Sequence, residues 1–174
     1  MRAKCFMFLL LCYLSDTSAV IYKNKLGREY IEIQPLEAAH YSNPILVNGV
    51  VYRTFKKYYC EVFKDFENSR TLLRGSKAWT FPRQDVNLTL AYPSAEHADL
   101  QIRIENDYVI TGYLVILFTD GLRGTAYIQS GGILEDTISL TFISEGITTL
   151  SYQFWLYGAP RSSIPAEEYK YVMC

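Results

Sequence analysis

From residue 77 onwards the chain is a series of short segments in which apolar and polar side chains alternate. Glycine, proline, aspartate or asparagine separates one segment from the next. Alternation with a period of two places the apolar side chains on one face of a β-strand. Several short strands at such spacing are typical of a single β-sandwich or a small barrel. We therefore expect an all-β, mainly antiparallel fold with strands over residues 77–81, 86–92, 100–105, 108–118, 125–129, 137–143 and 148–158.

Two of these segments carry more information than the others. Residues 108–118 are nearly all apolar, which is typical of a strand covered on both faces. The last segment has one apolar face, formed by Leu150, Tyr152, Phe154 and Leu156. Its other face carries Trp155 and Tyr157, which is too aromatic for a solvated face. We interpret Trp155 and Tyr157 as either covered or a contact surface.

The first third of the chain is less regular. Asn48-Gly49 lies between two apolar triplets, a strong signal for a β-hairpin. Apolar residues then recur at helical spacing, which predicts one short helix near residues 55–66, with Phe55, Tyr59, Val62, Phe63 and Phe66 on its buried face. A strand through residues 56–63 is the alternative. Residues 67–76 read as a polar connection.

The N-terminus has the layout of a secretory signal peptide. Arg2 and Lys4 precede an apolar run from Cys5 to Leu14, and small residues up to Ala19 follow. The run is too short to cross a bilayer, which takes about 20 residues. We expect cleavage after Ala19 and a secreted (extracellular) protein without a membrane span. An N-terminal core helix is the alternative reading.

The predicted domain organisation follows from these segments. Residues 1–19 form the signal peptide, and residues 20–68 form an N-terminal extension that packs on the domain. Residues 69–158 form the β-domain, and residues 159–174 form a C-terminal tail.

Cysteines and one sequon indicate processing in an oxidising compartment. If Cys5 and Cys12 leave with the signal peptide, Cys60 and Cys174 remain, and we predict a disulfide between them. The alternatives are free thiols or an intermolecular bridge, and a monomer is favoured over a covalent dimer.

Asn87-Leu88-Thr89 is the one N-x-[ST] sequon of the sequence, so we predict glycosylation at Asn87. We expect the Asn87 side chain to face away from the core that the neighbouring leucines enter.

Charge gives no reason to expect a nucleic-acid partner. The formal net charge is −1, so the chain has no overall attraction for phosphate backbones. Basic and aromatic residues mix over residues 53–66, where Arg53, Lys56, Lys57 and Lys64 lie. We favour a solvated face of an amphipathic element over an anionic docking surface for this patch.

We found no motif for catalysis, a cofactor or a metal ion. His40 and His97 lie in unrelated polar contexts, and no serine-hydrolase or zinc-protease motif is present. The acidic pairs 135–136 and 167–168 are sequence neighbours, which point to opposite faces of a strand and make poor acid–base partners. We therefore expect a non-enzyme with no cofactor and no metal.

The adjacent glycines Gly131 and Gly132 are interpreted as a structural turn. Glycine reaches a positive φ without steric cost, and we expect Gly132 to hold a left-handed conformation. Ser130 and Asp136 can hydrogen-bond turn backbone. No phosphate-binding motif or following helix supports a ligand loop.

The segment that includes this turn resembles the multiprotein bridging factor type 2 family of arthropods, many of whose members are called salivary secreted peptides. The likeness covers roughly residues 69–158. The family pattern matches at Ile110-Thr111, Asp120-Gly121, Ser130-Gly131-Gly132, Ser144, Gly146 and Tyr157-Gly158. The family often has a further glycine at the position of Leu134. The resemblance implies a secreted β-domain. The family name implies a transcriptional coactivator that bridges a nuclear receptor and a general transcription factor.

Two functions follow from these observations. The first is a secreted, non-catalytic β-sandwich that binds a protein or a small apolar ligand, and the aromatic segment 152–157 motivates it. The alternative is the nuclear coactivator role. The compartment in which the mature protein accumulates distinguishes them.

Overall fold

The computed structural model describes residues 21–23, 29–47, 50–62, 66–93 and 108–165. They form one antiparallel sheet with the order β1-β2-β7-β8-β6-β4-β3, and β5 pairs with the second edge of β8. The all-β, antiparallel fold expected from the alternating segments is confirmed. The strands are β1 (Ile21–Lys23), β2 (Glu29–Ile33), β3 (Glu37–Val47), β4 (Val50–Glu61), β5 (Arg70–Tyr92), β6 (Tyr108–Thr119), β7 (Gly124–Gly131) and β8 (Ile138–Pro160), and a 3₁₀ turn over Arg161–Ser163 follows.

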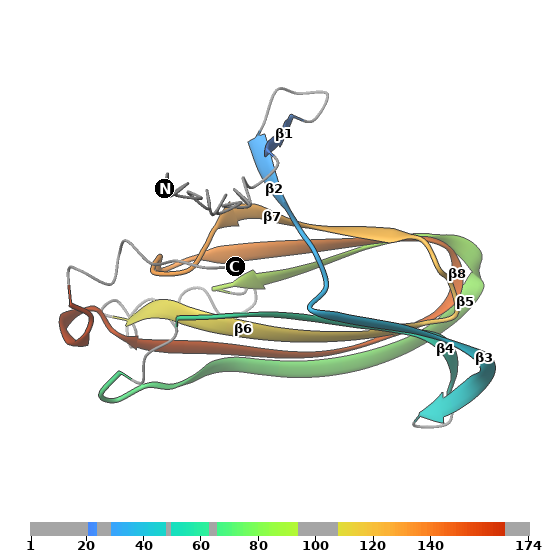
Figure 1. The fold of residues 1–174 in the computed structure, drawn as a ribbon, viewed down its shortest axis with the longest axis horizontal. Coiled ribbons are helices and arrows are strands. Elements are labelled where there is room, and N and C mark those ends of the chain that lie inside the picture. The colour runs from blue at the N-terminus through green and yellow to red at the C-terminus, as the bar shows by residue number, and fades with distance from the viewer. Residues whose placement is uncertain (1–20, 24–28, 48–49, 63–65, 94–107, 166–174) are drawn as a thin grey trace, which may run out of the picture.

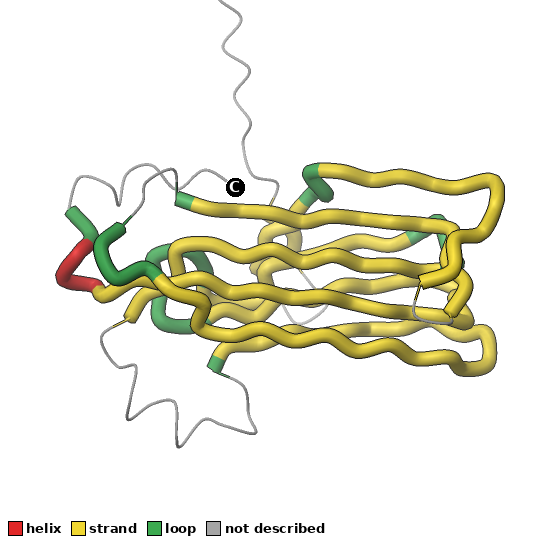
Figure 2. Tube along the Cα trace, turned by 90° about the horizontal axis from the view of Figure 1, so that it is seen from below, coloured by secondary structure: helices red, strands yellow, loops and turns green. Residues whose placement is uncertain are grey.

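Two very long strands fold this sheet over on itself. β5 and β8 pair along almost their entire length, from Arg70↔Gly158 to Tyr92↔Ile138. The first part of β8 pairs with β7, and its last part pairs with β6. In Figure 1 both long strands turn back at the right, so that β7 lies in an upper layer and β6 in a lower layer. Seen from below, the strands run side by side along the long axis (Figure 2).

The bend is marked by irregular pairing and by specific contacts. The β5–β8 register shifts on both sides of Gln84, which is characteristic of β-bulges. On β8, Gly146 has a φ of 59°, and its amide donates to Oδ1 of Asp85 at 2.8 Å. The expected break at Pro82 is therefore wrong, because the chain absorbs the proline in the bend and continues as one strand.

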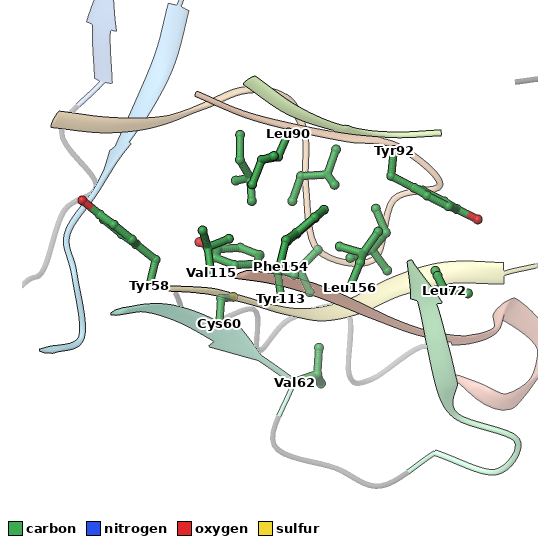
Figure 3. Packing of buried hydrophobic residues seen from close by; sticks show 14 of the residues in the cluster. Tyr58, Cys60, Val62, Leu72, Leu90, Tyr92, Tyr113, Val115, Phe154 and Leu156 are labelled. Carbon is green, nitrogen blue, oxygen red and sulfur yellow. The ribbon is translucent and has the colours of Figure 1, made fainter. Parts of the chain in front are cut away.

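The hydrophobic core lies between the two layers. Leu90 and Tyr92 of the upper layer face Tyr113, Phe154 and Leu156 of the lower layer (Figure 3). Along β5 the side chains of Leu90 and Tyr92 are buried, and those of Asn87, Thr89 and Ala91 are exposed. The period-two alternation of the sequence is thus the alternation between core and solvent.

The helix expected near residues 55–66 is wrong. Residues up to Glu61 belong to β4, which pairs with β6 from Thr54↔Thr119 to Glu61↔Gly112. Of the apolar residues at helical spacing, only Phe55 and Tyr59 lie in β4, and both are on the face that points away from the core that receives Tyr58 and Cys60. The polar connection over 67–76 is also wrong from Arg70 onwards, where β5 begins.

The N-terminal half supplies strands to the same sheet. The hairpin predicted around Asn48-Gly49 is present, because β3 and β4 pair up to Val47↔Val50. Residues 20–68, expected to pack on the domain as an extension, contain β1, β2, β3 and β4. The predicted strand over 100–105, the signal segment 1–19 with its cleavage at Ala19, and the end of the tail lie outside the described residues.

The glycine pair is a turn, but the roles within it differ from our expectation. Gly131, not Gly132, has the positive φ, at 67°. A Cβ at Gly131 would collide with the carbonyl oxygen of Thr137, whereas a Cβ at Gly132 would meet nothing within 4 Å. Leu134 also has a positive φ, of 66°, and its amide donates to the carbonyl of Ile110 at 2.7 Å.

No helix in the described part of the chain is long and apolar enough to span a membrane.

Candidate contact surface

The lower layer carries apolar side chains on the face that points away from the core. In β6, Val115 and Leu117 enter the core, so the alternating residues Leu114, Ile116 and Phe118 point outwards and are half-buried. The pairing register aligns them with outward residues of β4 and β8. We call this surface the outer apolar face, and it consists of Phe55, Tyr59, Leu114, Ile116, Phe118, Trp155 and Tyr157.

The aromatic rings of this face are arranged in rows across the strands. Tyr59, Leu114 and Trp155 lie opposite one another on β4, β6 and β8. Beyond the row that contains Lys57 and Ile116, Phe55 and Phe118 form a further pair, with ring centroids 5.5 Å apart. Tyr59 is 42% exposed, whereas the other six residues of the outer apolar face are half-buried. The structure thus places both predicted contact residues, Trp155 and Tyr157, on a wider apolar surface.

Trp155 also forms one wall of an open pocket. The pocket has a volume of about 310 Å³ and is lined by Thr71, Leu72, Leu73, Arg74 and Trp155. Arg74 lies opposite Trp155 in the β5–β8 register and is exposed. The pocket therefore combines an indole surface with a guanidinium group. This combination suits an apolar side chain that lies next to a carboxylate.

The basic patch predicted over residues 53–66 is divided between the two faces of β4. Lys57 points outwards opposite Ile116, with Glu37 of β3 paired to it on the other side. Lys56 points inwards, and its Nζ donates to the carbonyl oxygen of Gly124 at 3.1 Å. Burial lowers the pKa of Lys56 from its ordinary value. Arg53, Lys56 and Lys57, the members of the patch that the structure describes, thus do not form one continuous basic surface, and Lys64 lies outside the described residues.

The interior holds ionisable groups that stay neutral near pH 7. Burial raises the pKa of Tyr58 to about 12, and the carboxylate of Glu32 adds to the effect. Burial likewise raises the pKa of Tyr113 to about 12, with a smaller effect from Tyr58. Phenols with such pKa values keep their protons and act as core side chains.

Of the residues considered for catalysis, the structure describes His40, Glu135 and Asp136, while the acidic pair 167–168 lies outside the described residues. The exposed His40 lies with Nδ1 3.3 Å from Oγ1 of Thr54, and His97 falls outside the described residues. Glu135 and Asp136 are exposed in the β7–β8 turn. Among the described residues, no group of three histidine, cysteine, aspartate or glutamate side chains could hold a metal ion.

The predicted modification sites lie in contrasting environments. Asn87 is exposed on β5. Cys60 is 3% exposed in the core and is disulfide-bonded. The other cysteines lie outside the described residues, so the pairing of Cys60 with Cys174 stays a prediction.

Sequence reasoning missed most of the outer apolar face. The helical spacing predicted that Phe55 and Tyr59 are buried on one face of a helix. The apolar run 108–118 predicted a strand covered on both faces. The structure covers both faces only from Val109 to Tyr113. Residues 55–61 read Phe-Lys-Lys-Tyr-Tyr-Cys-Glu, which has no clean period of two, so the sequence holds no clear signal for this part of the face.

No family model, curated protein or solved structure matches the chain. The likeness to the multiprotein bridging factor type 2 family therefore rests on its short motifs alone and stays a prediction.

Proposed function

We propose that this is a secreted, non-catalytic β-protein that binds a partner protein through its outer apolar face. The observation that carries the proposal is the alignment of seven large apolar side chains on one outward face of β4, β6 and β8. A large outward apolar surface costs solvation free energy unless something covers it, and such patches commonly mark interaction sites. Aromatic residues and arginine are also the types enriched at the centres of protein interfaces.

The charges around the face suggest the chemistry of the partner. Lys57 lies within the face and Arg74 borders it at the Trp155 pocket. A partner surface with apolar side chains and one or two carboxylates would pair with both. A small apolar ligand is less well supported, because the outer face is a broad surface and not an enclosed cavity.

Leu134 departs from the family pattern in residue type, but its backbone conformation is compatible with that pattern. The family often has glycine at this position, and Leu134 adopts the left-handed conformation that glycine adopts most easily. The nuclear coactivator role remains the alternative function, and the signal-like N-terminus argues against it.

Expression in secretory cells tests the compartment. We expect protein in the medium that begins at or near Val20. An uncleaved protein that accumulates in the nucleus would overturn the proposal and favour the coactivator role.

A site-specific photo-crosslinker tests the surface. Gln153 lies beside Ile116 in the centre of the outer apolar face, and Thr125 is an exposed control position on β7. In the fluid into which the protein is secreted, we expect a discrete crosslinked product from position 153 and none from position 125. Ile116→Thr should abolish it, while Tyr127→Thr, on the outward side of β7, should not. Equal crosslinking from both positions would contradict a specific surface.

A further inference from the structure

The strands of the lower layer pair in the order β4, β6, β8 and β5, and their register defines rows of outward side chains. One row reads Tyr59, Leu114, Trp155 and Arg74 across the four strands. β4 and β5 lie equally far on either side of the line between β6 and β8. A two-fold axis along this line would place β4 of one copy over β5 of a second copy, and β6 over β8. Sheets that pack face to face keep their strands within about 30° of each other, so such a copy packs in the usual aligned way.

Tyr59 is the most prominent side chain of the outer apolar face, and the Trp155 pocket is the depression beside that face. Tyr59 is 42% exposed. The pocket of about 310 Å³ lies between β8 and β5, where Trp155 and Arg74 line it. Tyr59 and the pocket belong to the same row, on opposite sides of the line between β6 and β8. The two-fold axis therefore brings Tyr59 of each copy to the pocket of the other.

The chemistry of the pocket also matches Tyr59. The indole of Trp155 and the guanidinium of Arg74 suit an apolar side chain that lies next to a carboxylate. Tyr59 is such a side chain, because its hydroxyl donates a hydrogen bond to Oε2 of Glu61. Its ring can pack on Trp155 and under the guanidinium of Arg74, which then reaches the Glu61 carboxylate. The face is thus complementary in charge to a copy of itself.

Side-chain sizes along the other rows follow the same symmetry. Phe55 on β4 and Ala78 on β5 are the two ends of one row. Gly112 on β6 and Tyr157 on β8 are neighbours in another row. The two-fold axis places the large member of each pair over the small member from the second copy. Such alternation of large and small side chains lets two surfaces pack closely.

We propose that the partner of the outer apolar face is a second copy of this chain. The two copies form a non-covalent, two-fold dimer in which Tyr59 of each copy fills the Trp155 pocket of the other. The inference rests on the proposed function, because it names the occupant of the same face. The dimer covers an apolar surface that costs solvation free energy when it is exposed.

Reversal of the two charges at the pocket tests this pairing. In a dimer of Arg74→Glu, carboxylates meet carboxylates across the interface, and in a dimer of Glu61→Arg, guanidinium groups meet guanidinium groups. Both side chains are exposed and point outwards, so either variant should fold. Arg83→Glu changes the net charge as Arg74→Glu does, but at an exposed position of the bend outside these rows. Sedimentation velocity over a concentration series gives the dimer Kd of the secreted proteins, and circular dichroism confirms their fold.

We expect the wild type and Arg83→Glu to form dimers with the same Kd. Each single reversal should raise the Kd about 100-fold or more, because like charges then meet at a buried contact. An equimolar mixture of Arg74→Glu and Glu61→Arg should recover the dimer, since each contact then pairs one arginine with one glutamate. The double variant should recover it alone. If a reversal prevents folding, the crosslinker at position 153 of the wild type decides, and its product should have the mass of two chains.

Three outcomes would overturn the inference. The first is a wild type that stays monomeric at its highest soluble concentration. The second is a dimer that neither reversal weakens, which would place the contact elsewhere. The third is weakening by both reversals without recovery in the mixture. In each case a crosslink from position 153 to a different protein would leave the proposed function intact, whereas no crosslink at all would overturn both.

Discussion

Single side chains at turns hold neighbouring strands together, and Asp120 is the clearest example. It follows β6, and its carboxylate accepts hydrogen bonds from the amide and hydroxyl of Thr148 and from the amide of Thr149. The β6–β7 turn is thereby fastened to β8 just beyond the bend. Gly131 has the comparable role in the β7–β8 turn, where its left-handed φ lets the chain pass close to Thr137.

Asp120 should make stability depend on pH. Partial burial alone would raise its pKa, but the hydrogen bonds from Thr148 and Thr149 outweigh burial and hold the pKa below the ordinary 3.8. Because the folded pKa is the lower one, this stabilisation is complete above the unfolded value and is lost as the pH falls through the folded value. Thermal unfolding of the wild type and Asp120→Asn should therefore differ most near neutral pH and converge in acid. A constant difference down to about pH 2 would contradict this assignment.

Gly131 and Gly132 should respond differently to the same substitution. Gly131→Ala places a side chain in a left-handed conformation and against Thr137, so we expect a loss of about 1–3 kcal/mol in unfolding free energy. Gly132→Ala has open space and no such strain, and it should be neutral or stabilising by up to about 1 kcal/mol. Chemical denaturation of the two variants measures the difference. Equal losses would show that the whole turn, and not one φ angle, is sensitive.

Two strands are longer than the alternating segments predicted from the sequence, and both of them bend. β5 and β8 each join two segments that the sequence separates, at Pro82 in one and at Gly146 in the other. Both interruptions lie in the same bend, where bulges and a left-handed glycine change the direction of the chain. The bend creates two layers from one sheet, and so creates the core between them.

Asp85 should stabilise this bend. Its carboxylate accepts the amide hydrogen of Gly146 across the two strands. We expect Asp85→Ala to lower the unfolding free energy by about 1 kcal/mol, the usual net contribution of one such hydrogen bond. Hydrogen exchange should locate the effect, with faster exchange at Gly146 and unchanged exchange in the middle of β6. Uniformly faster exchange would indicate a global effect instead.

The whole molecule presents three different surfaces around one core. The outer apolar face covers one side of the lower layer, and the Trp155 pocket adjoins it. A separate groove of about 230 Å³ lies along β5 and is lined by Trp79, Phe81 and neighbouring residues of β5 together with Leu150 of β8. The two tryptophans thus report on separate places, Trp79 on the groove and Trp155 on the outer face. Spectroscopic variants that keep one tryptophan each can follow the two surfaces independently.

A disulfide between Cys60 and Cys174 should stabilise the entire fold. Closing a loop of more than about 100 residues contributes roughly 4–5 kcal/mol in the chain-entropy model, before native strain. Cys174→Ala keeps the buried Cys60 side chain in the core, and we expect it to lose most of this stabilisation. Peptide mapping without reductant identifies the bond directly. A Cys174–Cys174 link between two chains would overturn the intramolecular pairing.

The sequence by itself determined the fold class, the hairpin at Asn48-Gly49 and the outward position of Asn87, because each depends on local alternation or turn chemistry. Only the tertiary structure decided that residues 55–61 form a strand, that Gly131 holds the left-handed turn, and that segments on either side of Pro82 are one strand. Two of these outcomes depend on partners distant in the chain, since β6 pairs with residues 54–61 and Gly146 meets Asp85. The third depends on how the β7–β8 turn closes, which brings Thr137 against Gly131. The outer apolar face also depends on the tertiary structure. Its residues come from three strands, and only the pairing register places them side by side.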